Sequence, residues 1–155
     1  MLELLRNKSE NNQIELLDDR NYIFPSTMCN MYKQIRLGHR PFFNMPLTNQ
    51  MPIGYTILLN ENVEQFERFL MAIYHPNNMY CVHVDVKSSD SIKKGVKSIV
   101  DCFDNVFIAT KLESVMWGNF TFLKAQMNCM TDLVNLTNLI NNHENLMGKR
   151  IVNWE

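Results

Sequence analysis

The sequence predicts an α/β protein whose parallel β-sheet is flanked by helices and is incomplete within the chain. Short apolar runs typical of buried strands alternate with segments whose apolar residues recur every three or four positions, as in helices. This alternation favours parallel strands joined by right-handed crossovers. The 155 residues, 46% of them hydrophobic, suffice for one domain with its own core.

The first predicted strand is the apolar, partly β-branched run 53–59. After a turn at 60–62, a helix is expected over 63–73, because apolar residues recur there at helical spacing. Pro76 ends that helix, since proline cannot continue it. The helix is expected to bury Val63, Phe66, Phe69, Leu70 and Ile73.

The second strand, 79–85, is again nearly continuous in apolar character, and the third, 105–109, is shorter. Between them, residues 88–90 supply candidate N-caps for a helix. This helix is expected to bury Ile92, Val96, Ile99 and Val100.

A last helix is expected near 120–139, with the apolar face Leu123, Met127, Met130, Leu133 and Val134. The run Ile151-Val-Asn-Trp-Glu155 is typical of the start of another strand. The sequence therefore divides into an irregular covering segment (1–50), an α/β half-domain (51–140) and a link toward a missing second half (141–155).

Charge and hydropathy exclude several classes of protein. Fifteen basic residues face sixteen acidic ones, which excludes a polycationic nucleic-acid binder and an acidic tail. No apolar run approaches the eighteen or so residues that a membrane span needs, so none is predicted. Residues 1–6 lack the charged and apolar regions of a signal peptide.

The candidate site lies at the carboxyl ends of the strands, where parallel sheets bind ligands. These ends are residues 58–60, 85–87 and the loop 110–118. A carboxylate at Asp85 suits hydrogen bonds from ribose or base groups, and the ammonium of Lys87 suits a phosphate. The alternative is a helix-capping loop with a solvated ion pair.

Known phosphate and metal motifs are missing. The chain contains neither GxGxxG nor GxxxxGK[ST], and Asp-x-Asp, CxxC and HExxH are also absent, so no metal is expected. Cys81, His83 and Asp85 alternate along one strand face, which allows a metal cluster, but a hydrogen-bonded histidine at the rim of the core is the favoured interpretation. Trp117 suits a core plug, a lid or a ring stacked on a base.

Two motifs carry a resemblance to a known family. They are Tyr80-Cys-Val-His-Val-Asp-Val-Lys-Ser88 and Cys102-Phe-Asp-Asn-Val-Phe-Ile-Ala109. Both resemble the core-2/I-branching β-1,6-N-acetylglucosaminyltransferases, a family with xylosyltransferase relatives, and the similarity runs from about residue 29 to 133.

The resemblance implies a GT-A-like fold and metal-independent, inverting transfer of GlcNAc from UDP-GlcNAc to O-glycan or related acceptors. No cofactor is expected, and residues 51–140 become the donor-nucleotide-binding half. It also implies a type II membrane protein of the Golgi, whose anchor this chain does not contain. A xylosyl donor remains an alternative.

By motif position, the family's donor contacts fall on seven residues of this chain: Leu58, Leu59, Asn60, Asp85, Val86, Lys87 and Trp117. Family members often carry His where Asn60 stands and Tyr where Trp117 stands. Both departures are expected to reshape uridine binding without removing polar or stacking capacity.

Four cysteines allow three pairings, between which the sequence alone does not choose. The resemblance implies Cys29–Cys102 and Cys81–Cys129. The secretory location also gives meaning to three glycosylation sequons, at Asn7, Asn119 and Asn135. Asn119 is the least favoured, because a glycan there would crowd Trp117.

No catalytic residue is assigned within the chain. Inverting transfer needs a general base, and the resemblance places the family's glutamate beyond residue 155. We therefore expect this chain alone not to transfer GlcNAc. A non-catalytic UDP-sugar-binding module and a secreted structural domain remain alternatives.

Overall fold

The structure is a computed structural model that describes residues 18–38, 52–116 and 118–147, with side chains described up to residue 138. Its centre is a parallel sheet of three strands, β1 (Gly54–Leu59), β2 (Met79–Val84) and β3 (Val106–Ile108), in the order β1-β2-β3. Gly54 lies opposite Met79, and Tyr80 lies opposite Val106. The predicted parallel α/β fold is confirmed.

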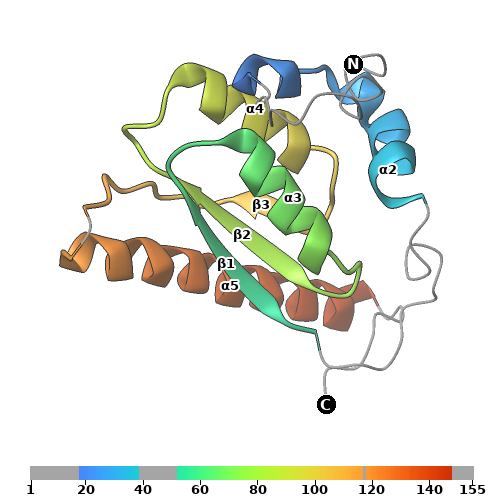
Figure 1. The fold of residues 1–155 in the computed structure, drawn as a ribbon. Helices are drawn as coiled ribbons and strands as arrows, with labels where there is room; N and C mark the ends of the chain where they lie inside the picture. The colour runs from blue at the N-terminus through green and yellow to red at the C-terminus, as the bar shows by residue number, and fades with distance from the viewer. Residues whose placement is uncertain (1–17, 39–51, 117, 148–155) are drawn as a thin grey trace.

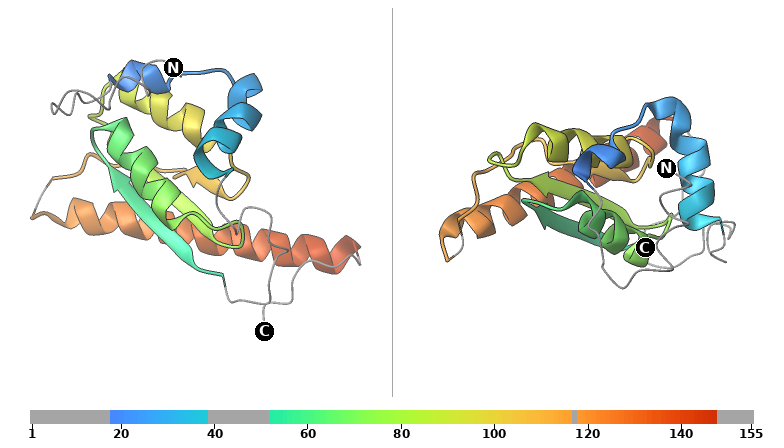
Figure 2. Two further views of the ribbon diagram at one scale, coloured as in Figure 1. Left: turned by 45° about the vertical axis from the view of Figure 1, so that its right-hand side comes forward. Right: turned by 45° about the horizontal axis from the view of Figure 1, so that its top comes forward.

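Helices cover both faces of this sheet. Helices α3 (Val63–Ile73) and α4 (Asp90–Val100) lie on one face, and the long α5 (Phe120–Met147) crosses the other (Figures 1 and 2). None of the helices within the described residues is long and apolar enough to cross a membrane.

The alternation of side chains along β2 divides the core in two. Tyr80, Val82 and Val84 are buried in the larger cluster with α3 and α4. Cys81 belongs to a smaller cluster against α5. Because neighbouring strand residues face opposite sides, His83 and Asp85 follow Cys81 on the α5 side.

The expected helix starts are present. Asn62, in the left-handed region with φ of 65°, caps α3 by accepting a hydrogen bond from the Gln65 N–H at 2.9 Å. Ser89 caps α4 through the Ile92 N–H. The predicted apolar face of α4 is buried throughout, whereas Phe69 on α3 is half exposed.

The predicted apolar face of α5 is wrong for four of its five residues, because only Leu133 packs against the core. Leu123 is 47% exposed and Met130 is 57% exposed, whereas Ala125 and Cys129 are fully buried against the sheet. The physical reason is close approach: a Cβ on Gly54 of β1 would lie only 3.3 Å from Leu133 of α5. Small side chains let the helix come this near, and the long apolar ones then point outward. The outward apolar residues are Phe120, Leu123, Met127, Met130 and Val134.

The described part of the N-terminal segment lies over α3 and α4, as a covering segment should. It forms two short 3₁₀ helices, η2 (Asp19–Tyr22) and η3 (Ser26–Met28), followed by α2 (Cys29–Leu37). The helix α2 was not predicted from the sequence. The expected strand at 151–155 lies outside the described residues, and the three domain boundaries stay predictions.

Of the two implied disulfides, the structure contains Cys29–Cys102, which joins α2 to the chain just after α4. The pair Cys81–Cys129 is a correction, because both are free thiols. They are fully buried between β2 and α5. Here the two sulfurs share a hydrogen bond, and this bond, followed by burial, raises the pKa of Cys81.

Candidate functional site

A cavity of about 300 Å³ opens at the carboxyl ends of β1 and β2. This is the place that the parallel topology predicts for a ligand. Four predicted residues from two strand ends meet there: Leu58, Leu59, Asn60 and Asp85, joined by Lys87 just beyond β2. The remaining wall comes from His83, Ser88, Val115 and Phe122.

Asp85 is buried and organises the loop after β3. Its Oδ1 accepts a hydrogen bond from the Lys87 N–H at 2.7 Å, and its Oδ2 accepts one from the Val115 N–H at 3.0 Å. Its own N–H donates to the Leu59 carbonyl at 2.8 Å. Asp85 therefore joins β1, β2 and the loop at one edge of the cavity.

Lys87 supplies positive charge at the mouth of the cavity. Its Nζ lies 4.0 Å from Asp85 Oδ2 and donates to the Val115 carbonyl at 2.8 Å. More than half of its side chain is exposed. The ammonium is thus fixed beside the cavity while still open to a ligand, so the ion pair and the binding role are compatible.

His83 is a site residue that the sequence interpretation placed only at the rim of the core. It is fully buried, and its Nε2 accepts a hydrogen bond from the Glu113 N–H at 2.7 Å. Burial lowers its pKa, against the opposing charge of Asp85. A neutral ring with the proton on Nδ1 is the form that accepts at Nε2. The sequence feature that could have identified His83 as a site residue is its position two residues before Asp85.

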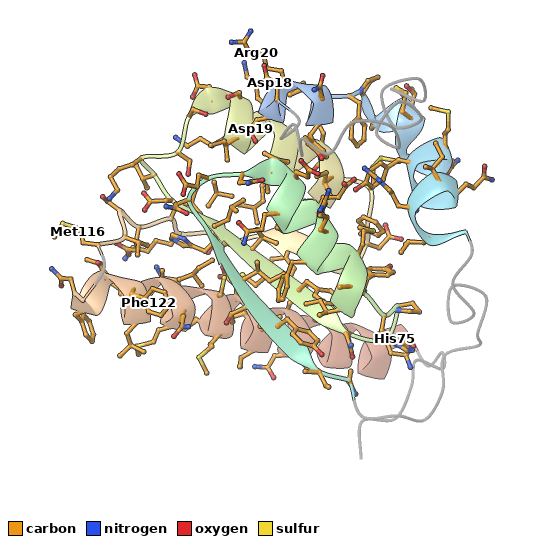
Figure 3. All side chains as sticks on the ribbon, viewed as in Figure 1. Asp18, Asp19, Arg20, His75, Met116 and Phe122 are labelled. Atoms are coloured by element: carbon orange, nitrogen blue, oxygen red, sulfur yellow. A yellow bond between two sulfur atoms is a disulfide. The ribbon has the colours of Figure 1, made fainter. Side chains whose placement is uncertain are left out.

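Ser88 and Phe122 were also missed as site residues. The Ser88 hydroxyl donates to the Asn60 carbonyl at 2.6 Å, which fixes the end of β1 against the turn after β2. Phe122 reaches the cavity from the first turn of α5, at the end of the molecule where Met116 also lies (Figure 3). Neither contact follows from spacing along the chain.

One predicted donor residue, Val86, is not part of the cavity wall. Val86 is half exposed and contributes main-chain bonds instead: its N–H donates to the Glu113 carbonyl, and its carbonyl accepts from Lys93 Nζ at 2.8 Å. Trp117 lies outside the described residues. Its role as a donor contact stays a prediction.

The loop after β3 is also held by side chains of α5. Asn128 donates to Glu113 Oε1 at 3.1 Å, and Lys124 Nζ lies 3.2 Å from Glu113. The hydrogen bond from Asn128, followed by that from Lys124, lowers the pKa of the Glu113 carboxyl. Side chains from both β2 and α5 therefore hold the loop that forms this part of the cavity wall.

The proposed metal alternative finds no support in the side-chain arrangement. No group of three or more His, Cys, Asp or Glu residues that could hold a metal ion occurs among the described residues. Cys81 contacts Cys129, and both His83 and Asp85 accept main-chain N–H groups. Each member of the alternating trio is thus engaged elsewhere.

Two of the three sequon asparagines are described. Asn119 is exposed just before α5, and Asn135 is exposed within α5. Asn7 lies outside the described residues. Glycosylation at all three positions stays a prediction.

The fold and the cavity together define an α/β protein with a ligand site at the carboxyl edge of a parallel sheet. Comparison with known proteins agrees with this class and identifies a family within it. The model of the Core-2/I-Branching enzyme family matches residues 53–143. The chain belongs to this family.

The similar curated proteins are β-1,3-galactosyl-O-glycosyl-glycoprotein β-1,6-N-acetylglucosaminyltransferases. The type 3 protein of Mus musculus is 40% identical over 134 residues, which cover 84% of this chain and 30% of the relative. The protein of Bovine herpesvirus 4 is 41% identical over 121 residues, 76% of this chain and 27% of the relative. The chain thus spans about a third of the length of these relatives.

Proposed function

We propose that this chain is the nucleotide-sugar-binding part of a β-1,6-N-acetylglucosaminyltransferase, and that it binds the UDP portion of UDP-GlcNAc. The cavity shared by the ends of β1 and β2 is the observation that carries the proposal. Its residues include Leu58, Leu59, Asn60, Asp85 and Lys87, which motif position assigned to the donor.

The chemistry of the cavity suits a nucleoside diphosphate. The main-chain and side-chain polar groups of Asn60 and Asp85 can orient a base or ribose, while Leu58 and Leu59 supply apolar contact. The Lys87 ammonium at the mouth offsets diphosphate charge without a metal ion. We extend the proposal to a glycan acceptor and to a Golgi location for the whole protein, from the family alone.

Transfer itself requires groups that this chain does not supply in the described part. The general base that would deprotonate the acceptor hydroxyl is expected outside residues 1–155. We therefore expect UDP binding by this chain without GlcNAc transfer. Turnover above background with radiolabelled UDP-GlcNAc would contradict this division of labour.

Calorimetric titration with UDP tests the donor site. We expect Asp85→Ala to weaken UDP binding at least tenfold, because the carboxylate and the loop that it holds are both lost. Asp101→Ala is the matched control, since Asp101 is an exposed carboxylate paired with Lys97 on α4. Equal affinity in the two variants would overturn the assignment.

A second variant separates the diphosphate from the nucleoside. Lys87→Ala is expected to weaken binding of UDP and to leave binding of uridine unchanged, because only UDP carries the charge that Lys87 faces. A chain that binds neither ligand at millimolar concentration would instead favour the structural-domain alternative. UDP binding by a complete family domain without turnover would favour the non-catalytic module.

A further inference from the structure

One face of α5 holds the loop 110–116, which connects β3 to α5. The residues of α5 that bind the loop are Thr121, Lys124, Asn128 and Asp132, which we call the polar stripe. They are three or four positions apart, so they lie on one side of the helix. The loop therefore lies between the polar stripe and the carboxyl end of β2.

The polar stripe binds both ends of the loop. At the first residue, Asp132 accepts hydrogen bonds from the N–H and the hydroxyl of Thr110, both at 2.8 Å. At the last residue, the Met116 N–H donates to the Thr121 hydroxyl at 3.0 Å. A side-chain change in the middle of the loop therefore leaves both of its ends attached to α5.

Glu113, in the middle of the loop, joins α5 to the end of β2. Its carboxylate accepts hydrogen bonds from Asn128 at 3.1 Å and from Lys124 at 3.2 Å. Its main chain binds on the other side, where the N–H donates to His83 at 2.7 Å and the carbonyl accepts from the Val86 N–H at 3.3 Å. The side chain of Glu113 thus fixes the middle of the loop relative to α5.

Two residues further along, the main chain of Val115 contacts both charged groups of the cavity. Its N–H donates to Asp85 Oδ2 at 3.0 Å, and its carbonyl accepts from Lys87 Nζ at 2.8 Å. More than half of the Lys87 side chain is exposed. Because a long, exposed lysine side chain has many rotamers, the position of its ammonium depends on where the Val115 carbonyl lies.

We propose that Glu113 is a positioning residue for the donor diphosphate and acts through Val115 and Lys87. By holding the middle of the loop against α5, it keeps the Val115 carbonyl where the Lys87 ammonium faces the cavity. Glu113 is not part of the cavity wall, so its effect on the ligand is indirect. The inference rests on the proposed binding of UDP and adds to it a residue outside the cavity that sets the affinity for the diphosphate.

Charge repulsion alone predicts the opposite effect of Glu113. Removing a carboxylate near an anionic ligand strengthens binding, because like charges repel. The removal also frees the ammonium groups of Lys111 and Lys124, which lie 3.7 and 3.2 Å from the Glu113 carboxylate. Removing a positioning residue instead weakens binding. The sign of the change in UDP affinity therefore distinguishes the two effects.

Calorimetric titration of the Glu113→Ala variant with UDP and with uridine tests the proposal. We expect the UDP affinity to fall roughly fivefold, a size typical of coupled contacts, and the uridine affinity to stay within about twofold. Asn128→Ala, which removes a bond to Glu113 without changing the charge, should also weaken UDP binding. Stronger UDP binding by the Glu113 variant, or an equal loss for UDP and uridine, would overturn the proposal.

A double-variant cycle shows whether Glu113 acts through Lys87. In the Lys87→Ala background, Glu113→Ala should not weaken UDP binding further, and additive losses would contradict the proposal. Thr131→Ala is the matched control on α5, since its hydroxyl binds the Met127 carbonyl of the same helix, and it should leave both affinities unchanged. A wild-type chain that binds no UDP would refute the proposed function and this inference together. UDP binding that depends on Lys87 but not on Glu113 would refute the inference alone.

Discussion

Two buried side chains at the end of β2 fix the position of the loop that closes the cavity. His83 accepts the Glu113 N–H, and Asp85 accepts the Val115 N–H. His83 accepts at Nε2, so it holds the loop only in its neutral form. One wall of the cavity therefore depends on the protonation state of His83.

This arrangement predicts a stability that falls on mild acidification. Burial lowers the pKa of His83 in the folded protein below its unfolded value of about 6.5. At pH values between the folded and the unfolded pKa, the unfolded chain therefore binds more protons than the folded protein. The stabilisation is complete above the unfolded pKa and is lost as pH falls below it. The free energy of unfolding should fall between pH 7.5 and 5.5, by at most about 1.4 kcal/mol per pH unit from this group.

The matched variant is His83→Gln, whose amide oxygen can accept the Glu113 N–H without titrating. Denaturant unfolding across the same pH range should show a flatter profile for this variant. The pKa of Glu113 is also lowered, but this carboxyl changes the stability only in a more acidic range. Its contribution to the free energy of unfolding is lost only as the pH falls below the pKa of the carboxyl in the unfolded chain. Parallel profiles for the two proteins would exclude His83 as the source.

At the scale of the element, α5 shows that a helix can bury its small residues and expose its large ones. Ala125 and Cys129 face the sheet, while Met127 on the outer side is half exposed. The distance between α5 and β1 is set by Gly54, whose missing side chain leaves room for Leu133. Enlarging a small buried residue of α5 should therefore destabilise the protein more than shortening a large exposed one. Hydrophobicity alone suggests the reverse order.

We predict that Ala125→Leu destabilises the protein by about 1–3 kcal/mol, because the added atoms have no space between α5 and the sheet. Leu123→Ala should cost less than about 1 kcal/mol, since that side chain is already half exposed. Denaturant unfolding of the two variants measures both values. The reverse order would mean that Leu123, and not Ala125, faces the core.

The elements with the clearest periodicity were predictable from sequence. The three strands, α3 and α4 lie within one or two residues of their expected bounds, because apolar spacing and capping residues agree there. The same strands located the cavity, since the carboxyl ends of parallel strands meet at one edge. The contribution of Asp85 to that edge was expected on this ground.

Other features depend on contacts that spacing does not encode. The face of α5 was misjudged because its long apolar residues recur at helical spacing, a pattern that says nothing of how near the sheet lies. Ser88 and Phe122 enter the cavity through contacts with residues far away in the sequence. The helix α2 was missed, although five of its nine residues are apolar, because residues 1–50 were interpreted as an irregular covering segment.

At the scale of the whole molecule, two independent links fasten the α2 part of the N-terminal segment to the α/β core. One is the Cys29–Cys102 disulfide. The other is buried Glu67 of α3, which binds Arg36 of α2 through two hydrogen bonds of 2.8 and 2.7 Å and accepts the Tyr32 hydroxyl at 2.8 Å. Burial raises the pKa of Glu67, against the charge of Arg36, which lowers it.

The disulfide closes a loop across 73 residues, and the chain-entropy model gives such a crosslink about 4 kcal/mol. We therefore predict that replacing both Cys29 and Cys102 by Ser lowers the free energy of unfolding by roughly this amount. Replacing the free thiols Cys81 and Cys129 by Ala, in contrast, should leave the loss of stability on adding a reductant unchanged, because this variant retains the Cys29–Cys102 crosslink. Loss of stability on adding a reductant to the Cys29, Cys102 double variant would contradict this assignment of the crosslink.

The edge position of β1 in the described sheet has a consequence for synthesis on the ribosome. Strand β1 ends at Leu59 and α5 ends at Met147, so about 90 residues are made after β1 before the described fold is complete. At about 5–20 residues per second, this takes on the order of 5–20 s. An unpaired strand edge is a template for pairing with another chain. Nascent chains of this fold are therefore exposed to edge-to-edge pairing at β1 throughout this interval.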